Sequence, residues 1–232
     1  MISVSEIAKS YGSKVALDSV SFDVLPGEVV AILGPNGAGK TTTLRVITGL
    51  VKPTHGTVAI LGKSAAPETV QKEVGYLPDE PFLYPKLTGR EFLTFLASIR
   101  RLPQKVAEAR ISELTTAFDL TDGFDELTEA YSLGMKRKLA LCGALLHNPS
   151  ILVLDEPLNG LDPKSVKRVK ELLVEFSAAG KCVLLSTHLL DIAQALCTSV
   201  AIINKGKLIL EKQPMGQVRG SLEERFLAIT AQ

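Results

Sequence analysis

Nine consecutive residues have the composition and spacing of a loop that binds phosphate: Gly34, Pro35, Asn36, Gly37, Ala38, Gly39, Lys40, Thr41 and Thr42. They match the pattern G-x-x-x-x-G-K-[ST], in which glycines allow backbone N–H groups to turn towards an anion. Lys40 would carry a positive charge to the outer phosphates, and the hydroxyl of Thr41 would be a ligand for Mg²⁺. A helix beginning at Lys40 would add the positive end of its dipole. The segment predicts a polyphosphate site.

Polar residues with matching chemistry follow two later apolar segments. Asp155 and Glu156 come directly after the apolar run 151–154, and His188 closes the apolar run that starts at Cys182. In open α/β sheets, ligands bind at the carboxyl ends of the strands, so these side chains are expected beside the phosphate loop. One carboxylate, Asp155, would hold Mg²⁺, and the other, Glu156, would orient a water molecule.

Buried strands and intervening helices are needed to position these residues. The run from Glu28 to Leu33 is typical of a strand that is buried on both faces of a parallel sheet. A helix is expected from Lys40 to Gly49, and another from Asp162-Pro163 to Gly180, where a cap residue precedes a proline. The other expected elements are strands at 2–7, 15–24 and 58–61, a hairpin formed by 200–203 and 207–210, and a tail helix containing Phe226 and Leu227.

The periodicity becomes helical after Pro78, and residues 85–148 are interpreted as a helical subdomain inserted into the α/β core. Thr88 and Glu91 form a capping box, and apolar residues follow at helical spacing. A second helix is expected near Pro103, and a third opens at Ser132. The chain is therefore expected to form a single domain, 1–232, with its core built from 1–84 and 149–232.

Composition excludes several classes of protein. The formal net charge of the 232 residues is +1, so no excess of basic residues indicates binding to nucleic acid. The three cysteines, Cys142, Cys182 and Cys197, show no C-x-x-C spacing and are expected to be reduced and buried. No uncharged apolar run approaches the roughly 20 residues that a spanning helix needs. Any step across a membrane is therefore expected to depend on a separate protein.

The ordered motifs resemble those of the nucleotide-binding subunit of an ABC (ATP-binding-cassette) transporter, from about residue 2 to about residue 212. The loop at 34–42 is similar to the Walker A motif, 151–155 to Walker B and 159–162 to the D-loop. Tyr11 resembles the aromatic residue that stacks on adenine. Ser132 and Gly134 fall where the signature sequence of this family opens a helix.

The resemblance implies a P-loop NTPase core of the ABC ATPase type, with an antiparallel β subdomain and an inserted helical subdomain. It implies an ATPase with ATP and Mg²⁺, in which Glu156, His188 and Lys40 are catalytic and Thr41, Asp155 and Asp79 serve the metal. Ser132 and Gly134 would contact ATP held by a second copy of the chain or by a homologous ATPase subunit, in a head-to-tail dimer. Two copies would drive an integral membrane permease from the cytoplasmic face of the cell membrane, and nucleic acid is not an expected partner.

Two segments depart from the family pattern. The signature Leu-Ser-Gly-Gly-Gln is here Tyr131-Ser132-Leu133-Gly134-Met135, and the glutamine of the Q-loop is replaced by Asp79. An aspartate can still serve Mg²⁺, but it adds negative charge near the phosphates and cannot donate a hydrogen bond. Such variants resemble the export-type branch, in which the ATPase and the permease are separate chains.

Three alternatives remain open from the sequence. A soluble ABC ATPase acting on ribosomes or DNA would usually carry tandem cassettes or basic extensions. A P-loop kinase or GTPase would lack the histidine at 188 and the D-loop. A regulatory cassette would bind ATP without hydrolysing it, and the altered residues at 79, 133 and 135 are compatible with that function.

Overall fold

A central six-stranded sheet organises the computed structural model, which describes residues 1–217, 222–223 and 226. The strand order is β10-β9-β3-β8-β7-β6, and every neighbouring pair is parallel except β9 with β10. The strands are β3 (Val29–Leu33), β6 (Val74–Leu77), β7 (Ile151–Asp155), β8 (Cys182–Thr187), β9 (Ser199–Asn204) and β10 (Lys207–Pro214). Strands β3, β7 and β8 are completely buried, as their continuous apolar runs predict.

A second, antiparallel sheet packs beside the first. Its order is β2-β1-β4-β5, with β1 (Ile2–Tyr11), β2 (Lys14–Val24), β4 (His55–Ile60) and β5 (Lys63–Ser64). The first strand extends beyond the predicted end at residue 7 and reaches Tyr11, because its pairing with β2 continues through Lys9 and Ser10 to Tyr11, which lies opposite Lys14. This extension carries Tyr11 to the end of the sheet.

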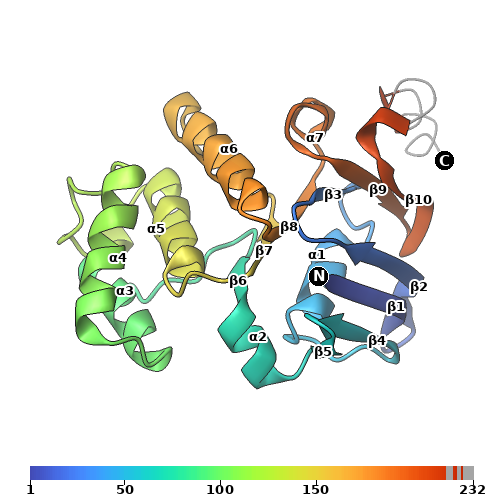
Figure 1. The fold of residues 1–232 in the computed structure, drawn as a ribbon, viewed down its shortest axis with the longest axis horizontal. Helices are drawn as coiled ribbons and strands as arrows, with labels where there is room; N and C mark the ends of the chain where they lie inside the picture. Colours follow the sequence, from blue (N-terminus) through green and yellow to red (C-terminus); the bar gives the residue numbers. More distant parts are fainter. Residues whose placement is uncertain (218–221, 224–225, 227–232) are drawn as a thin grey trace.

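Strand β3 connects two hydrophobic cores because its side chains alternate between the faces of the central sheet. Val29, Ala31 and Leu33 pack into a core shared with the later helices, whereas Val30 and Ile32 pack into a core shared with the antiparallel sheet. Helix α1 (Lys40–Ile47) contributes to the second core and lies between the two sheets (Figure 1). The phosphate loop is thus held between well-packed elements.

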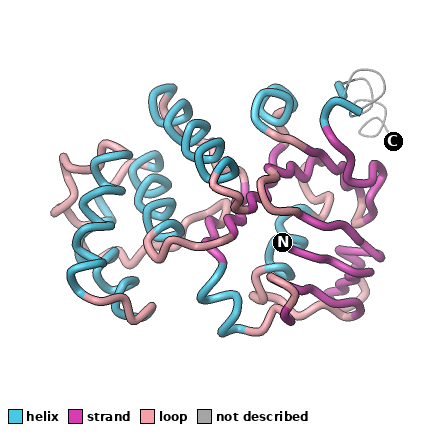
Figure 2. Tube along the Cα trace, in the orientation of Figure 1, coloured by secondary structure: helices cyan, strands magenta, loops and turns pink. Residues whose placement is uncertain are grey.

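Three helices stand together at the opposite end of the molecule from the antiparallel sheet (Figures 1 and 2). They are α3 (Gly89–Ile99), α4 (Gln104–Ala117) and α5 (Leu133–Leu145), with a short 3-10 turn, η1 (Thr128–Ala130), before α5. The capping box of Thr88 and Glu91 is confirmed, since each side chain bonds the backbone N–H of the other residue. The boundaries of the helical subdomain, at residues 85 and 148, stay a prediction.

The remaining helices cover the central sheet. Helix α6 (Pro163–Ala178) begins at the predicted cap, Asp162, whose side chain accepts a hydrogen bond from the N–H of Ser165 at 2.9 Å. Three short helices were not predicted: α2 (Pro67–Glu73), α7 (Leu190–Leu196) and η2 (Met215–Gln217). They have at most two turns, too few to show a clear apolar period. Most of the expected tail helix, including Leu227, lies outside the described residues.

The cysteines agree with the prediction, because Cys142, Cys182 and Cys197 are all free and buried. Burial raises the pKa of the Cys197 thiol to about 12, which keeps it protonated near neutral pH. Within the part of the chain that the structure describes, no helix combines the length and the apolar character needed to cross a membrane.

Candidate active site

The parallel register of the central sheet brings the predicted residues to one edge. Leu33 at the end of β3 pairs with Thr187 at the end of β8, and Asp155 at the end of β7 pairs with Ser186. The residues that follow these strands therefore emerge side by side. Strand β6 ends at Leu77, in register with Leu154, so the segment carrying Asp79 leaves the sheet at the same edge.

The phosphate loop has the backbone geometry that its glycines predict. Gly37 and Gly39 have φ values of 77° and 112°, which L side chains rarely adopt. A Cβ at Gly34 would lie 2.3 Å from the carbonyl oxygen of Ile203, so only glycine fits there. The buried Lys40 Nζ donates to the carbonyl oxygen of Gly34 at 2.6 Å. The lysine is therefore held inside the loop, with its charge beside the backbone that would meet a phosphate.

Glu156 is held from several directions. Its backbone N–H donates to the carbonyl oxygen and to Oγ of Ser186, at 3.2 and 3.0 Å. Its Oε1 lies 3.0 Å from Nδ1 of His188 and 3.5 Å from Nζ of Lys40. Its φ of +47° is uncommon for a residue with a side chain, and such conformations persist where the surroundings impose them, often at functional sites. The geometry thus joins all three predicted catalytic side chains at one carboxylate oxygen.

Asp155 is almost fully buried, with 1 % of its surface exposed. Its Oδ1 accepts a hydrogen bond from the Ser186 hydroxyl, but its Oδ2 is buried without a hydrogen-bond partner among the described residues. Burial raises the pKa of Asp155, while the hydrogen bond from the Ser186 hydroxyl opposes that shift. A buried carboxylate oxygen without a partner, close to a hydroxyl, fits a divalent cation with oxygen ligands.

The described residues contain no group of three or more histidines, cysteines or acidic residues placed to hold a metal by themselves. Mg²⁺ usually keeps several waters and is bound through one or two carboxylates together with substrate phosphates. Asp79 borders the same cleft as Asp155 and Thr41. The donor set of hydroxyl and carboxylate oxygens fits Mg²⁺ in preference to a softer metal.

A cleft of about 460 Å³ lies over these residues. It is bordered by the phosphate loop and by residues from four other segments: Tyr11, Lys14, Val15, Ala16, Asp79, Asp155, Glu156, Lys205 and Gly206. The Tyr11 ring is half exposed, and the ammonium of Lys9 lies 5.1 Å from its centroid. A flat exposed ring at one end and a phosphate loop at the other match the two ends of a nucleotide.

Ser132 and Gly134 do not border this cleft. The Ser132 side chain accepts a hydrogen bond from the N–H of Met135 at 3.2 Å and caps the start of α5. Leu133 is exposed and lies over Gly160, where an added Cβ would come within 3.0 Å of its side chain. Within one chain, the start of α5 is therefore separate from the phosphate loop.

Two functional candidates were missed in the sequence. Ser186 holds both Asp155 and the backbone of Glu156, and its only signal was a hydroxyl at the end of an apolar strand. Arg137, on α5, is buried and donates hydrogen bonds to the carbonyl oxygens of Glu156 and Asp79. It stands between two other basic residues, Lys136 and Lys138, and nothing in this pattern signals that it is buried.

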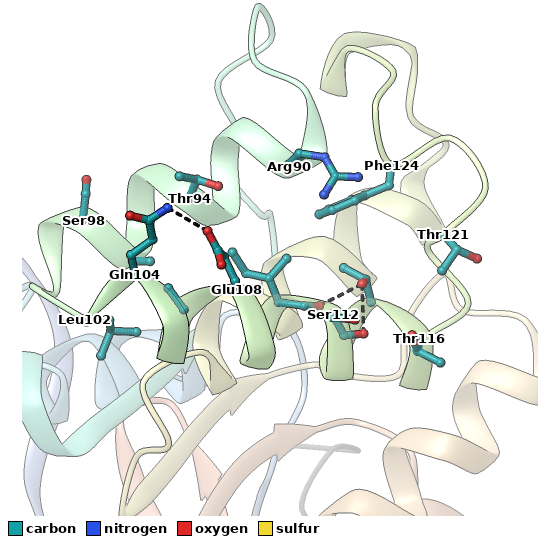
Figure 3. Close-up of a pocket in the computed structure, with 14 residues that line it drawn as sticks. Arg90, Thr94, Ser98, Leu102, Gln104, Glu108, Ser112, Thr116, Thr121 and Phe124 are labelled. Atoms are coloured by element: carbon teal, nitrogen blue, oxygen red, sulfur yellow. Dashed lines mark hydrogen bonds between the residues drawn. The ribbon is translucent and has the colours of Figure 1, made fainter.

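A larger cavity, of about 700 Å³, lies between α3, α4 and the segment that follows α4 (Figure 3). Its base is apolar, and its rim carries hydroxyl groups and the bonded pair Gln104 and Glu108. The guanidinium of Arg90 at its edge is already paired with Asp125 at 2.7 Å. Because its charged groups are satisfied and none of the predicted catalytic residues borders it, this cavity is not the candidate active site.

The site combines a P-loop after the buried strand β3, carboxylates at the end of β7, and a cleft with an aromatic ring at one end. These features define a nucleotide-binding P-loop NTPase. The model of the ABC transporter family matches residues 17–159. The chain is 33% identical to the lantibiotic transport ATP-binding protein SrtF of Streptococcus pyogenes, an alignment that covers 97% of this chain and 96% of SrtF. The chain belongs to the ABC transporter family.

Solved structures show the same fold. The structure of an ATP binding subunit of an ABC transporter superimposes with a TM-score of 0.91 at 33% identity, covering 99% of each chain. A dimeric, post-hydrolysis state of the ATP-binding cassette MJ0796 bound to ADP and Pi superimposes with a TM-score of 0.84 at 25% identity, covering 95% of this chain and all of that one. The ABC ATPase fold, with its antiparallel sheet and added helices, is confirmed.

Proposed function

We propose that this protein binds and hydrolyses ATP to power transport through a separate membrane permease. The observation that carries the proposal is the meeting of Lys40, His188 and Glu156 at one carboxylate oxygen beside the phosphate loop. Each group follows a different parallel strand of the central sheet, Lys40 at the start of α1 after β3, Glu156 after β7 and His188 after β8. Together they supply a cation, an orienting imidazole and a base. These are the parts that phosphoryl transfer to water requires.

ATP would lie with adenine on the Tyr11 ring and its phosphates in the loop at 34–42. Backbone N–H groups of the loop and the start of α1 would bind the phosphate oxygens, and Lys40 would exchange its bond to Gly34 for the outer phosphates. Thr41, Asp155 and Asp79 would hold Mg²⁺, which neutralises charge on the phosphates when bound.

Glu156 would act as the general base. Its Oε2 is buried and has no hydrogen-bond partner among the described residues, so this oxygen is available to accept a proton from an attacking water. The contact of His188 Nδ1 with Oε1 fixes the direction of the carboxylate. Lys40 and His188 would then stabilise the negative charge that develops on the transferring phosphoryl group.

A second copy of the chain would complete the site. Ser132 and Gly134 lie at an exposed helix start, away from the cleft of their own chain, where a hydroxyl and a backbone N–H can meet a phosphate held by another chain. The dimeric cassette among the similar structures supports this arrangement. Two chains placed head to tail would enclose two ATP molecules, with each α5 start facing the phosphate loop of the other chain.

A cluster of exposed aromatic rings follows the Asp79 segment and is our candidate contact for the permease. Phe82 is 75% exposed, and its ring stacks edge-on against Tyr84, which in turn stacks against Phe95. Phe95 and Ile99, at helical spacing on α3, belong to the apolar stripe expected there, yet both side chains are exposed among the described residues. Exposed aromatic clusters of this kind mark interaction sites.

The permease would hold the chain on the cytoplasmic face of the membrane. SrtF is named as a lantibiotic transport protein, which supports placing this chain in the export-type branch, with the permease as a separate chain. The intact base, lysine and histidine favour hydrolysis over a purely regulatory role. The near-neutral net charge favours a permease over ribosomes or nucleic acid as the partner.

The direct test is ATP turnover by the purified chain. We expect phosphate release that requires Mg²⁺, falls to background when EDTA is added and returns when Mg²⁺ is restored, because Asp155 and Thr41 act through the metal. Turnover that is unaffected by EDTA would contradict the assigned metal site. ATP that binds without any phosphate release would favour the regulatory alternative.

The aromatic cluster around Phe82 is open to a direct binding test. The substitution Phe82→Ser should reduce the amount of permease that co-purifies with the tagged chain from detergent-solubilised membranes by about fivefold or more, since exposed aromatic residues are frequent hot spots of binding. The control is Val174→Ser, at an exposed apolar position on α6. Equal recovery of the permease with both variants would show that the contact lies elsewhere.

A further inference from the structure

Arg137 is a buried cation for which the proposed reaction has no role. It lies on α5, five residues after Ser132, and only 4% of its surface is exposed. A buried guanidinium is costly unless its donors are satisfied, so its contacts indicate what the fold uses it for. The inference below rests on the proposed ATPase function.

The donors of Arg137 reach two strand-end segments at once. Nη1 donates to the carbonyl oxygen of Glu156, and Nη2 donates to the carbonyl oxygen of Asp79 and lies 3.4 Å from its Oδ1. Nε has no hydrogen-bond partner among the described residues. Most of the contacts of this charged group are therefore made to backbone, which means that it fixes chain positions rather than neutralising a buried acid.

Arg137 contacts Glu156 at a point where the backbone has an uncommon conformation. With a φ of +47°, Glu156 is held by Ser186 at its N–H, while its carbonyl oxygen accepts from Arg137 and from the N–H of Asn159 at 3.2 Å. Together these bonds fix the peptide on either side of the Cα atom, and with it the direction of the side chain. The carboxylate that we assign as the base thus depends on α5 for its orientation.

The contact with Asp79 offsets the charge that replaces the usual glutamine. Asp79 is half exposed and borders the nucleotide cleft, so an unpaired carboxylate there would repel phosphates. A guanidinium within 3.4 Å reduces that repulsion and holds the segment close to α5. The residue at 79 and the arginine at 137 therefore act as a pair.

We infer that Arg137 is a positioning residue that links the start of α5 to the catalytic carboxylate and to the Asp79 segment. The rigid helix carries Ser132 and Gly134 at the same end, so a movement of α5 that brings them to a second chain also shifts the two carbonyl oxygens held by Arg137. Closure of the dimer and alignment of Glu156 would in this way be coupled mechanically. The adjacent Lys138, 3.2 Å from Asp162, fastens α5 to the D-loop as well.

Two substitutions test the link. Arg137→Met removes the charge and the donors, and Arg137→Lys keeps the charge but cannot reach both carbonyl oxygens with a planar fork. We expect kcat for ATP hydrolysis to fall by about 10- to 100-fold in both variants, because small misplacements of a catalytic group have effects of this size. KM should change by less than about threefold in Arg137→Lys, because the phosphate loop is intact and a positive charge remains beside Asp79. The control is Arg168→Met, on the partly exposed face of α6.

Hydrogen exchange provides a readout that does not depend on turnover. Loss of the link should increase amide exchange in both segments 78–82 and 156–160, while the loop at 34–42 stays as in the wild-type chain. If wild-type protein shows no ATP turnover, the proposed function fails, and the exchange result still decides the role of Arg137. If Arg137→Met does not fold, Arg137→Lys provides the same comparison. A kcat within twofold of wild type for Arg137→Lys, or exchange changes confined to α5, would overturn the inference.

Discussion

Replacing Glu156 with glutamine is expected to reduce the ATP turnover number by about 100- to 10,000-fold, the range that a general base contributes. Glutamine has nearly the same shape and can keep the contact with His188, but it cannot take a proton from water at neutral pH. The change therefore separates catalysis from binding. Phosphate release under saturating ATP and Mg²⁺ measures the effect, and affinity for ATP should be retained.

The same variant should accumulate as a dimer. If hydrolysis is blocked while both nucleotides remain bound, light scattering in ATP and Mg²⁺ should give a mass near twice 24.9 kDa. Glu68→Gln, at an exposed position on α2, serves as the matched control and should behave like the wild-type chain. Turnover at the wild-type rate in Glu156→Gln would falsify the assignment of the base. A chain that stays monomeric would argue against the two-copy site, unless assembly requires the permease.

Replacing Lys40 with methionine should have the second-largest effect. Methionine retains the aliphatic volume in a buried site but removes the cation that bonds Gly34 and lies 3.5 Å from Glu156. Loss of one group that stabilises the developing charge typically costs about 100- to 1,000-fold in turnover. Unlike Glu156→Gln, this variant should also bind ATP more weakly, since Lys40 contacts phosphate in the ground state as well.

Fluorescence titration with a labelled ATP analogue and a turnover assay together distinguish the two variants. Lys63→Met, in an exposed position on β5, is the matched control for removal of one lysine charge. Thermal unfolding should confirm that each variant is folded. Unchanged affinity and turnover in Lys40→Met would show that the loop binds phosphate through its backbone alone.

The local features of this protein were determined by sequence. The loop at 34–42 needs only neighbouring residues: glycines for its turns and a lysine at the correct spacing. The caps at Thr88 and Asp162 are equally local, because each side chain bonds a backbone N–H three residues later. Continuous apolar runs predicted the buried strands that carry Asp155 and His188 to the sheet edge. Fold class and catalytic candidates follow from such patterns.

The tertiary structure decided how distant parts of the chain act on one another. The burial of Arg137 could not be predicted, because it depends on two carbonyl oxygens that are 19 and 58 residues away in sequence. The exposure of Phe95 and Ile99 depended on whether another element covers α3, which a periodic apolar stripe does not reveal. From the sequence alone, the Asp79 carboxylate is expected to repel the phosphates of ATP. The structure places the Arg137 guanidinium beside it, which offsets that charge. Short-range interactions between neighbouring residues let the sequence specify the phosphate loop, the helix caps and the buried strands. Packing between residues far apart in the sequence determines which side chains come into contact.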